Sequence, residues 1–242
     1  MRSISYANRW LGLYEEGIER AKEALEIYER LNDVFGQGQV LRELAWLLYH
    51  DEQLDAVEEA ALRAINLLSG TDDQYEVCGC RRLLGNVHHS KGDTEKAIDQ
   101  FETAIRIAST FGWHQALFWN NYNLAGLFFD EGRSDEAHIH IQRAKSYTIN
   151  DQYQLGRAME LQANFCYEEG KSEEAKSEAL RAAEVYERIG AAKDAERCKT
   201  ILRDIEQRMR RPVAPRESGF DGIGELLDTT LLPTPVNSSF LA

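Results

Sequence analysis

The stretch LGNVHHSKGDTEKAIDQFETAIRIA, residues 84–108, decides the fold, because its spacing of small and large residues recurs along the chain. Gly85 is followed by Ala97, Phe101 and Ala104 at offsets of 12, 16 and 19 residues. The same offsets hold from three other small residues, so that the four anchors are Ala45, Gly85, Ala125 and Ala163, spaced by 40, 40 and 38 residues. A period of this length indicates repeated structural units.

Each unit is expected to contain two amphipathic helices joined by a tight turn. Small residues at the anchor and at its counterpart on the second helix let two helix backbones approach closely, while larger residues fill the remaining space. Helix-breaking residues cluster between the helices, in KGDT (91–94), EGRS (131–134) and EGK (169–171). The glycines expected just beyond each first helix are Gly92, Gly132 and Gly170, and the residues expected to cap each second helix are Asp93, Ser134 and Ser172.

Proline separates the chain into two regions. All four prolines lie at or beyond Pro212, and the preceding residues are rich in Ala, Glu, Leu, Lys and Arg, which predicts an all-α region. We therefore expect one repeat domain over residues 1–210, with about five units of 38–40 residues and a charged capping helix at its end. Residues 211–242 are expected to form a flexible, disordered tail, in which GIGELLDTTLL (222–232) could be a docking segment.

The pattern of small residue, aromatic residue and alanine resembles that of tetratricopeptide-repeat (TPR) proteins. It is carried by Gly85, Ala97, Phe101 and Ala104, and more loosely by the other units. The resemblance implies a right-handed superhelix of stacked antiparallel helix pairs that binds a protein or peptide without a cofactor. The period is longer than the usual ~34 residues, the fourth-position Trp is absent, and no unit ends in proline.

Several phrases also resemble the C-terminal repeat arrays of fungal NACHT or NB-ARC receptor-like proteins and of MalT-like regulators. They are ERLND (29–33), FWNNYNLAGLFFDEGR (118–133), RAKSY (143–147) and LGRAMELQA (155–163). This resemblance implies a sensor or scaffold within a larger signalling assembly. No G-x-x-x-x-G-K-[ST] motif occurs, and the chain starts within a helical pattern, so it is hypothesised to be a fragment.

The resemblance places a peptide-binding groove on the first helix of each unit, at fixed positions around the anchors. The groove residues so implied are Arg42, Trp46, Tyr49, Arg82, Asn86, His89, Trp119, Tyr122, Asn123, Phe129, Arg157, Asn164 and Tyr167. Arginine and aromatic residues are typical of binding hot spots. The alternative for Trp46, Trp119 and Phe129 is packing between units.

A narrower hypothesis concerns a carboxylate clamp, as in chaperone-binding members of the family. Arg82, Asn86, Asn123 and Arg157 occupy most of the clamp positions and could hold a terminal carboxylate. Leu161 stands where the family has its last cationic residue.

Composition limits the classes of partner. The formal net charge of −13 and the pI of about 5.0 argue against general binding to nucleic acid or to anionic membranes. The chain has neither a span of ~20 apolar residues nor a secretory signal, so we expect a cytoplasmic protein. The four cysteines are then expected to be free thiols, with no metal or redox site.

No catalytic or metal-binding motif is apparent. The histidine pairs His88-His89 and His138/His140 lack the i, i+4 spacing of a helical zinc site, and no nucleophile–base pair or phosphate loop is found. The sequence therefore predicts a protein that is not an enzyme. Two alternatives remain: self-association through the N-terminal repeat, and a hydrolytic site around His88, His89 and Cys78.

Overall fold

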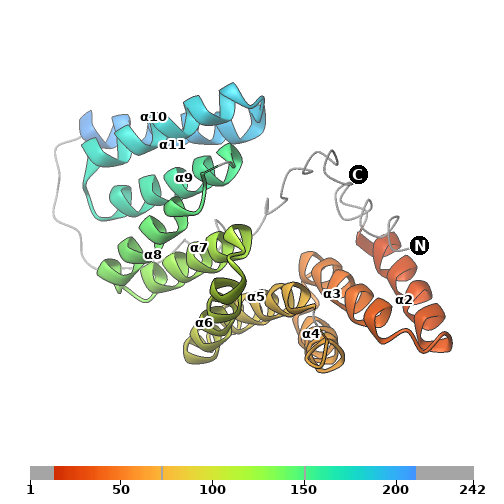
Figure 1. Cartoon of the computed structure of the whole chain (residues 1–242). Coiled ribbons are helices and arrows are strands. Elements are labelled where there is room, and N and C mark those ends of the chain that lie inside the picture. Colours follow the sequence, from red (N-terminus) through yellow and green to blue (C-terminus); the bar gives the residue numbers. More distant parts are fainter. Residues whose placement is uncertain (1–13, 72, 150, 211–242) are drawn as a thin grey trace. The chain divides into compact units, whose positions relative to one another are not determined.

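The computed structural model describes residues 14–71, 73–149 and 151–210, and these residues form ten α-helices and no strand (Figure 1). The helices are α2 (Tyr14–Arg30), α3 (Val34–His50), α4 (Leu54–Leu68), α5 (Gln74–Ser90), α6 (Thr94–Phe111), α7 (His114–Asp130), α8 (Ser134–Ser146), α9 (Gln152–Glu168), α10 (Ser172–Arg188) and α11 (Ala192–Arg210). The expectation of an all-α solenoid is confirmed. The predicted tail, its docking segment and the first thirteen residues lie outside the described part.

The helices follow the period of the anchors. The first helices of the pairs, α3, α5, α7 and α9, begin at residues 34, 74, 114 and 152, and each second helix begins twenty residues later. Every turn between a first and a second helix has three residues. The pairs are therefore in register, and a position in one pair has a defined equivalent in the others.

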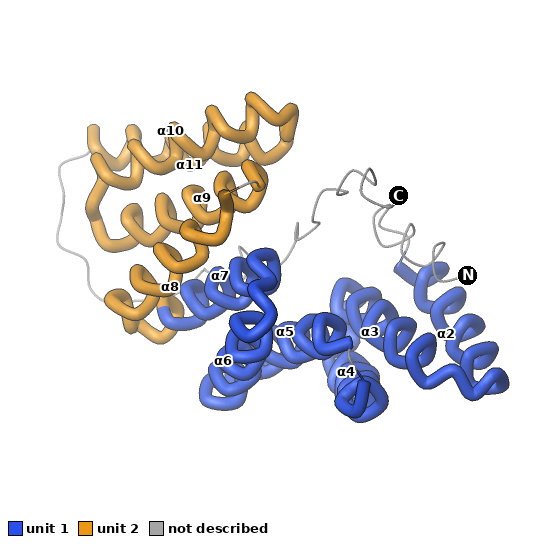
Figure 2. Tube along the Cα trace, viewed as in Figure 1, with its two compact units in different colours: residues 1–128 blue, residues 129–242 orange. Residues whose placement is uncertain are grey.

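The chain divides into two compact units, residues 1–128 and residues 129–242, coloured separately in Figure 2. In the first unit each helix from α2 to α6 packs against the next, and α3 also contacts α5 directly. In the second unit α8 packs on α9, α9 on α10 and α10 on α11. This pattern is that of stacked helix pairs, in which each element contacts its near neighbours.

Small residues bring paired helices together. The anchors Ala45, Ala125 and Ala163 have no exposed surface. At Gly85 a Cβ atom would lie 2.5 Å from Cε1 of Phe101 on the paired helix α6. No side chain fits in that space, so the aromatic ring takes the place of the missing Cβ.

The turns after the first helices use a left-handed residue. Gly92, Gly132 and Gly170 have φ angles of 77°, 72° and 80°, as expected for residues that end a helix. In the first full pair the same place is taken by Glu52, whose φ is 59°. A residue with a Cβ is strained in this conformation, by roughly 1–2 kcal/mol.

The predicted caps of the second helices are wrong for two of the three. Ser134 and Ser172 are already the first helical residues of α8 and α10, and Arg133 and Lys171 stand at the N-cap positions. The three-residue turn leaves a single residue between the left-handed glycine and the helix, so that the serine falls one place too late. Asp93 does stand at the N-cap of α6, but its side chain makes no capping hydrogen bond.

Helix α11 occupies the place of a first helix but lacks a small anchor. It begins forty residues after α9, which puts Arg203 in the place of Ala163. Arg203 is exposed and forms an ion pair with Glu196 on the same helix. A long charged side chain at this place prevents another helix from approaching α11 as closely as α10 approaches α9.

The contact at Gly85 predicts a specific cost of adding one methyl group. Gly85→Ala should lower the free energy of unfolding by about 1–3 kcal/mol in urea denaturation, because overpacking forces the Phe101 ring to move. Gly79→Ala on the same helix is the control, since its Cβ would meet only the flexible Arg42 stem at 3.1 Å. A double-mutant cycle with Phe101→Leu should recover part of the loss, and strict additivity of the two changes would contradict the contact.

The strained turn predicts a stabilising substitution. Glu52→Gly should raise the free energy of unfolding by up to about 1 kcal/mol, because relief of the left-handed strain exceeds the greater chain entropy of glycine in the unfolded state. Glu52→Ala removes the same charge and keeps the strain, so it should give no gain. Equal stabilisation by both variants would show that charge, and not φ, is responsible.

Candidate functional site

A cationic side chain is held between tryptophans on the first helices of unit 1. The guanidinium carbon of Arg82, on α5, lies 4.5 Å from the ring centroid of Trp46 on α3 and 5.6 Å from that of Trp119 on α7. Both distances are within the range of cation–π attraction. The two indoles are 4% exposed, so their rings pack in the protein while they orient the arginine. We call Trp46, Arg82, Asn86, Trp119 and Asn123 the central strip.

Two amides of the central strip are joined across helices. Nδ2 of Asn123 on α7 donates a hydrogen bond of 2.7 Å to Oδ1 of Asn86 on α5. Within the described ranges, Asn86 Nδ2 and Asn123 Oδ1 have no hydrogen-bond partner in the protein, and neither is a fully buried atom. The pair thus retains an –NH2 group on one residue and a carbonyl oxygen on the other that are not engaged within the protein, and exchanging N and O in both amides would leave the same balance. One donor and one acceptor are what a peptide group requires.

A second arginine lies beside the strip in an ion pair. Arg42 on α3 is paired with Glu76 on α5, and Glu43 lies 3.9 Å from the same guanidinium. Burial disfavours the charge on Arg42, but the carboxylates of Glu76 and Glu43 outweigh this effect and raise its pKa. Arg42 therefore remains cationic and links α3 to α5.

Aromatic rings extend the strip on both sides. His50 stacks on Tyr14 with ring centroids 5.2 Å apart, and Trp46 and Tyr49 also lie next to its ring. On α7 the ring of Tyr122 meets Trp119 edge-on at 5.7 Å. These contacts fix the ring orientations on two of the first helices, α3 and α7.

Two exposed aromatic residues on the same face were not among the predicted groove residues. Phe35 and Tyr75 lie seven residues, two helical turns, before Arg42 and Arg82, and they are 46% and 43% exposed. The hydroxyl of Tyr75 donates to Oε1 of Gln115 at 2.8 Å. A search for heptad spacing from the predicted groove residues would have found them.

The structure places each predicted groove residue as follows. In unit 1, Trp46, Tyr49, Asn86, Trp119, Tyr122 and Asn123 are buried, whereas Arg42, Arg82 and His89 are partly exposed. In unit 2, Phe129 and Arg157 are buried, whereas Asn164 and Tyr167 are partly exposed. Three residues of the hypothesised carboxylate clamp therefore belong to unit 1, and the fourth, Arg157, belongs to unit 2.

The predicted residues of unit 2 lie among structural contacts. Phe129 stacks on Phe165 with centroids 4.2 Å apart. Arg208 of α11 donates to the backbone oxygen of Tyr167 at 2.6 Å and lies over its ring at 4.8 Å. Arg208 thereby satisfies a carbonyl group in the last turn of α9.

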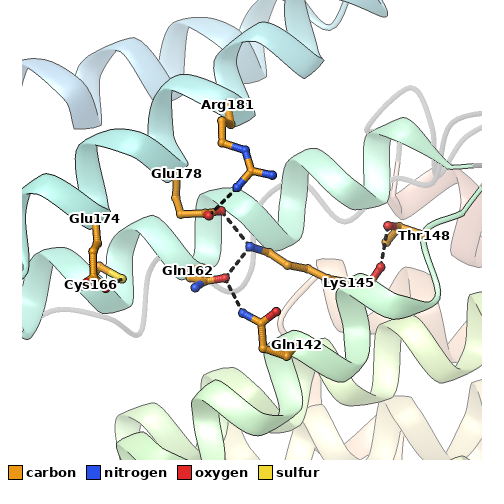
Figure 3. Close-up of polar contacts among 8 residues, drawn as sticks. All are labelled: Gln142, Lys145, Thr148, Gln162, Cys166, Glu174, Glu178 and Arg181. Carbon is orange, nitrogen blue, oxygen red and sulfur yellow. Dashed lines mark hydrogen bonds and ion pairs between the residues drawn. The ribbon is translucent and has the colours of Figure 1, made fainter.

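The polar cluster in Figure 3 connects three helices of unit 2. Nζ of Lys145, on α8, lies 2.8 Å from Glu178 on α10 and also donates to Gln162 on α9. Gln142 donates to Gln162 at 3.1 Å, and Arg181 pairs with Glu178 at 2.8 Å. The Glu178 carboxylate is thus neutralised by two cations, an arrangement that suits helix packing rather than proton transfer.

The hydrolytic alternative does not form a nucleophile–base pair. Cys78 and His88 are ten residues apart on one straight helix, which separates them by about 15 Å along its axis. Sγ of Cys78 lies 3.6 Å from the backbone oxygen of Ala104, and burial raises the pKa of this thiol to about 11. Among the residues that the structure describes, no group of three His, Cys, Asp or Glu side chains could hold a metal ion. Nor is any helix there long and apolar enough to cross a membrane.

Comparison with known proteins supports a repeat fold. The tetratricopeptide repeat family model matches residues 83–111, which include the stretch 84–108 that carries Gly85, Ala97, Phe101 and Ala104. No match to a curated protein was found. The chain is therefore similar to tetratricopeptide-repeat proteins over one matched repeat.

Solved structures extend the likeness in fold to most of the chain. BtubC (BKLC) from P. vanneervenii has 19% identity and a TM-score of 0.60 over 87% of this chain and 98% of its own. A Rap protein complexed with Competence and Sporulation Factor has 15% identity and a TM-score of 0.63 over 86% of this chain, which spans 63% of the Rap chain. A putative kinesin light chain of Podosopora anserina with nearly identical TPR-like repeats has 14% identity and a TM-score of 0.52, over 87% of this chain and 95% of its own.

Buried thiols predict slow reaction with thiol reagents. All four cysteines are free and buried, and burial raises the pKa of Cys80 and of Cys198 to about 12. Since the thiolate is the reactive form, the native chain at neutral pH should react with a disulfide reagent at least ~100-fold more slowly than the chain in guanidinium chloride. Rapid labelling of one native cysteine would contradict this and would reveal an activated thiol.

Proposed function

We propose that this protein is a non-enzymatic binding module that recognises an extended protein or peptide segment along the first helices of its pairs. The proposal is supported by the matched repeat and by the fold shared with a Rap protein that was solved in complex with Competence and Sporulation Factor. The bound factor belongs to the Rap protein. At 15% identity the likeness concerns the fold of this chain and does not identify its ligand.

The observation that carries the proposal is the joined pair of amides. Asn86 and Asn123 hold each other in place, so little side-chain entropy is lost when their remaining donor and acceptor meet a ligand backbone. Contacts to the peptide group bind the main chain without regard to sequence. Neighbouring side chains then supply selectivity.

Arg82 supplies the charge in this scheme. Its guanidinium is oriented by two indoles on neighbouring helices, so it attracts a negative group on the ligand from a fixed position. In unit 2 the partly exposed Asn164 and Tyr167, and not the buried Arg157, would be available for recognition. We assign the module to a cytoplasmic signalling or regulatory assembly of the receptor-like or MalT-like kind, on the resemblance of the phrases noted above.

The proposal predicts that removing the joined amides weakens peptide binding while the fold is kept. Peptides selected on the wild-type chain from a displayed library of random dodecamers would be measured by fluorescence polarisation. Asn86→Leu together with Asn123→Leu should weaken binding by roughly tenfold or more, because two hydrogen bonds of about 1 kcal/mol each are lost. Replacing both partners of a buried hydrogen bond by apolar groups leaves stability nearly unchanged.

The matched control is Gln207→Leu, an amide replaced on the exposed face of α11. It should bind the selected peptides as the wild type does. Equal dissociation constants for the double variant and the control would refute the proposed function, as would a failure to select any peptide on the folded wild-type chain.

A further inference from the structure

The two kinds of turn in unit 1 differ in chemistry. The turns inside the helix pairs, residues 51–53 (DEQ) and 91–93 (KGD), are short and charged. The turns between successive pairs, α2 to α3, α4 to α5 and α6 to α7, have exposed apolar side chains in them or beside them. Unit 1 therefore has an apolar surface where one helix pair passes to the next.

The exposed apolar side chains of unit 1 are concentrated at these turns. Among the large hydrophobic residues that are exposed in the described part of the unit, all but Leu62 lie within two residues of a turn between pairs. Together with the partly exposed Trp113 we call them the apolar edge: Leu31, Val34, Phe35, Tyr75, Phe111 and Trp113. Clustered exposure of this kind marks a surface that binds another molecule, whereas single exposed apolar residues are common on any protein.

The rings of the apolar edge are neighbours across the turns. Tyr75 meets Trp113 edge-on with ring centroids 5.3 Å apart, and Trp113 stacks on Phe111 at 4.4 Å. Phe35 lies in the first turn of α3, as Tyr75 does in the first turn of α5, and these two helices contact each other directly. The axes of packed helices are about 8–10 Å apart, so the edge continues from one pair to the next.

Polar groups beside the rings are already engaged within the chain. The hydroxyl of Tyr75 donates to Oε1 of Gln115 at 2.8 Å. Thr71 Oγ1 and Gln74 Nε2 donate to backbone oxygens at 2.8 and 3.0 Å, and Asp33 accepts from a backbone N–H in the first turn of α3 at 2.9 Å. A polar surface placed here would lose hydrogen bonds to water with little replacement, so the edge favours an apolar partner surface.

The exposed area of the edge has the size that a stable dimer needs. Leu31, Val34, Phe35, Tyr75 and Phe111 are 68%, 45%, 46%, 43% and 53% exposed, which amounts to roughly 400 Å² of surface. A stable interface buries about 800 Å² on each partner, of which somewhat more than half is apolar. The apolar edge with the polar residues around it is therefore large enough for the centre of such an interface.

We propose that two copies of the chain associate through the apolar edge of unit 1, edge against edge, about a two-fold axis. An apolar surface whose polar neighbours are already engaged is complementary to another surface of the same kind, as an isologous contact requires. Phe35, Tyr75 and Phe111 of one copy then pack on the edge of the other and lose their contact with water. The inference goes beyond the proposed function and does not rest on it, because no residue of the central strip takes part.

Sedimentation velocity of the full chain over a range of concentrations tests the inference. The wild type should change from monomer to dimer as its concentration rises. Phe35→Ser and Phe111→Ser, introduced separately, should each raise the dimer dissociation constant roughly tenfold or more, the loss expected for a hot-spot residue. Both side chains are about half exposed, so these variants keep the fold, which circular dichroism checks.

The matched control is Leu62→Ser on α4. Leu62 is 47% exposed and is the large hydrophobic residue of the described part of unit 1 that is exposed away from the apolar edge. The variant loses a comparable apolar side chain from the same unit. It should dimerise as the wild type does.

Salt separates an apolar contact from a contact between charges. Two copies with a net charge of −13 repel each other, so raising NaCl from about 50 to 500 mM should tighten the dimer several-fold as this repulsion is screened. A contact formed by opposite charges would weaken under the same change. A dimer that weakens with salt would therefore contradict the inference.

Three further results would overturn it: a chain that stays monomeric at every concentration, association that survives Phe35→Ser combined with Phe111→Ser, and growth beyond the dimer. The second would place the interface elsewhere, as in stacking through the N-terminal repeat. The third would place the edge against a different face of the next copy, since such a contact does not close. The proposed function is tested separately, by the library-selected peptides and the asparagine variants.

Discussion

The structure depends on one steric constraint, the contact between a residue without a side chain and a large ring on the paired helix. At Gly85 the ring of Phe101 fills the space that a Cβ would need, and alanines take the equivalent places in the other pairs. Close backbone approach fixes the register of each pair. Register in turn decides which side chains of the first helices stand side by side, including Arg82 between its two tryptophans.

Much of the fold was predictable, because packing constraints leave a periodic record in sequence. The spacing of the anchors predicted the period of the helices, and Gly92, Gly132 and Gly170 predicted where the left-handed turns lie. The caps were less predictable, since a serine at the start of a helix fits either the N-cap or the first helical position, and only backbone geometry separates the two. The strained φ of Glu52 could not be predicted either, because the backbone conformation of a non-glycine residue is not evident from its type.

The candidate site was predictable in position and less so in chemistry. A map of positions around each anchor found the central strip, but it did not extend two turns earlier to Phe35 and Tyr75. Nor could it separate residues that pack from residues that face solvent, because arginine and tryptophan serve both purposes. Arg157 illustrates this, being 4% exposed although its position is that of a groove residue. Cross-helix contacts, such as that of Asn86 with Asn123, depend on rotamers that periodicity does not encode.

Arg203 occupies the place on α11 at which the other first helices have a small anchor residue. In a repeat protein, the uncovered apolar face of a terminal helix can pack against a further repeat or against another chain. The long charged side chain of Arg203 hinders close packing of another helix at this place, while α11 keeps its own contacts with α9 and α10. The residue at the anchor place of a first helix thus determines how closely a second helix can pack on it, and exchanging a small residue for a long charged one at that place is a way to weaken such packing in designed repeats.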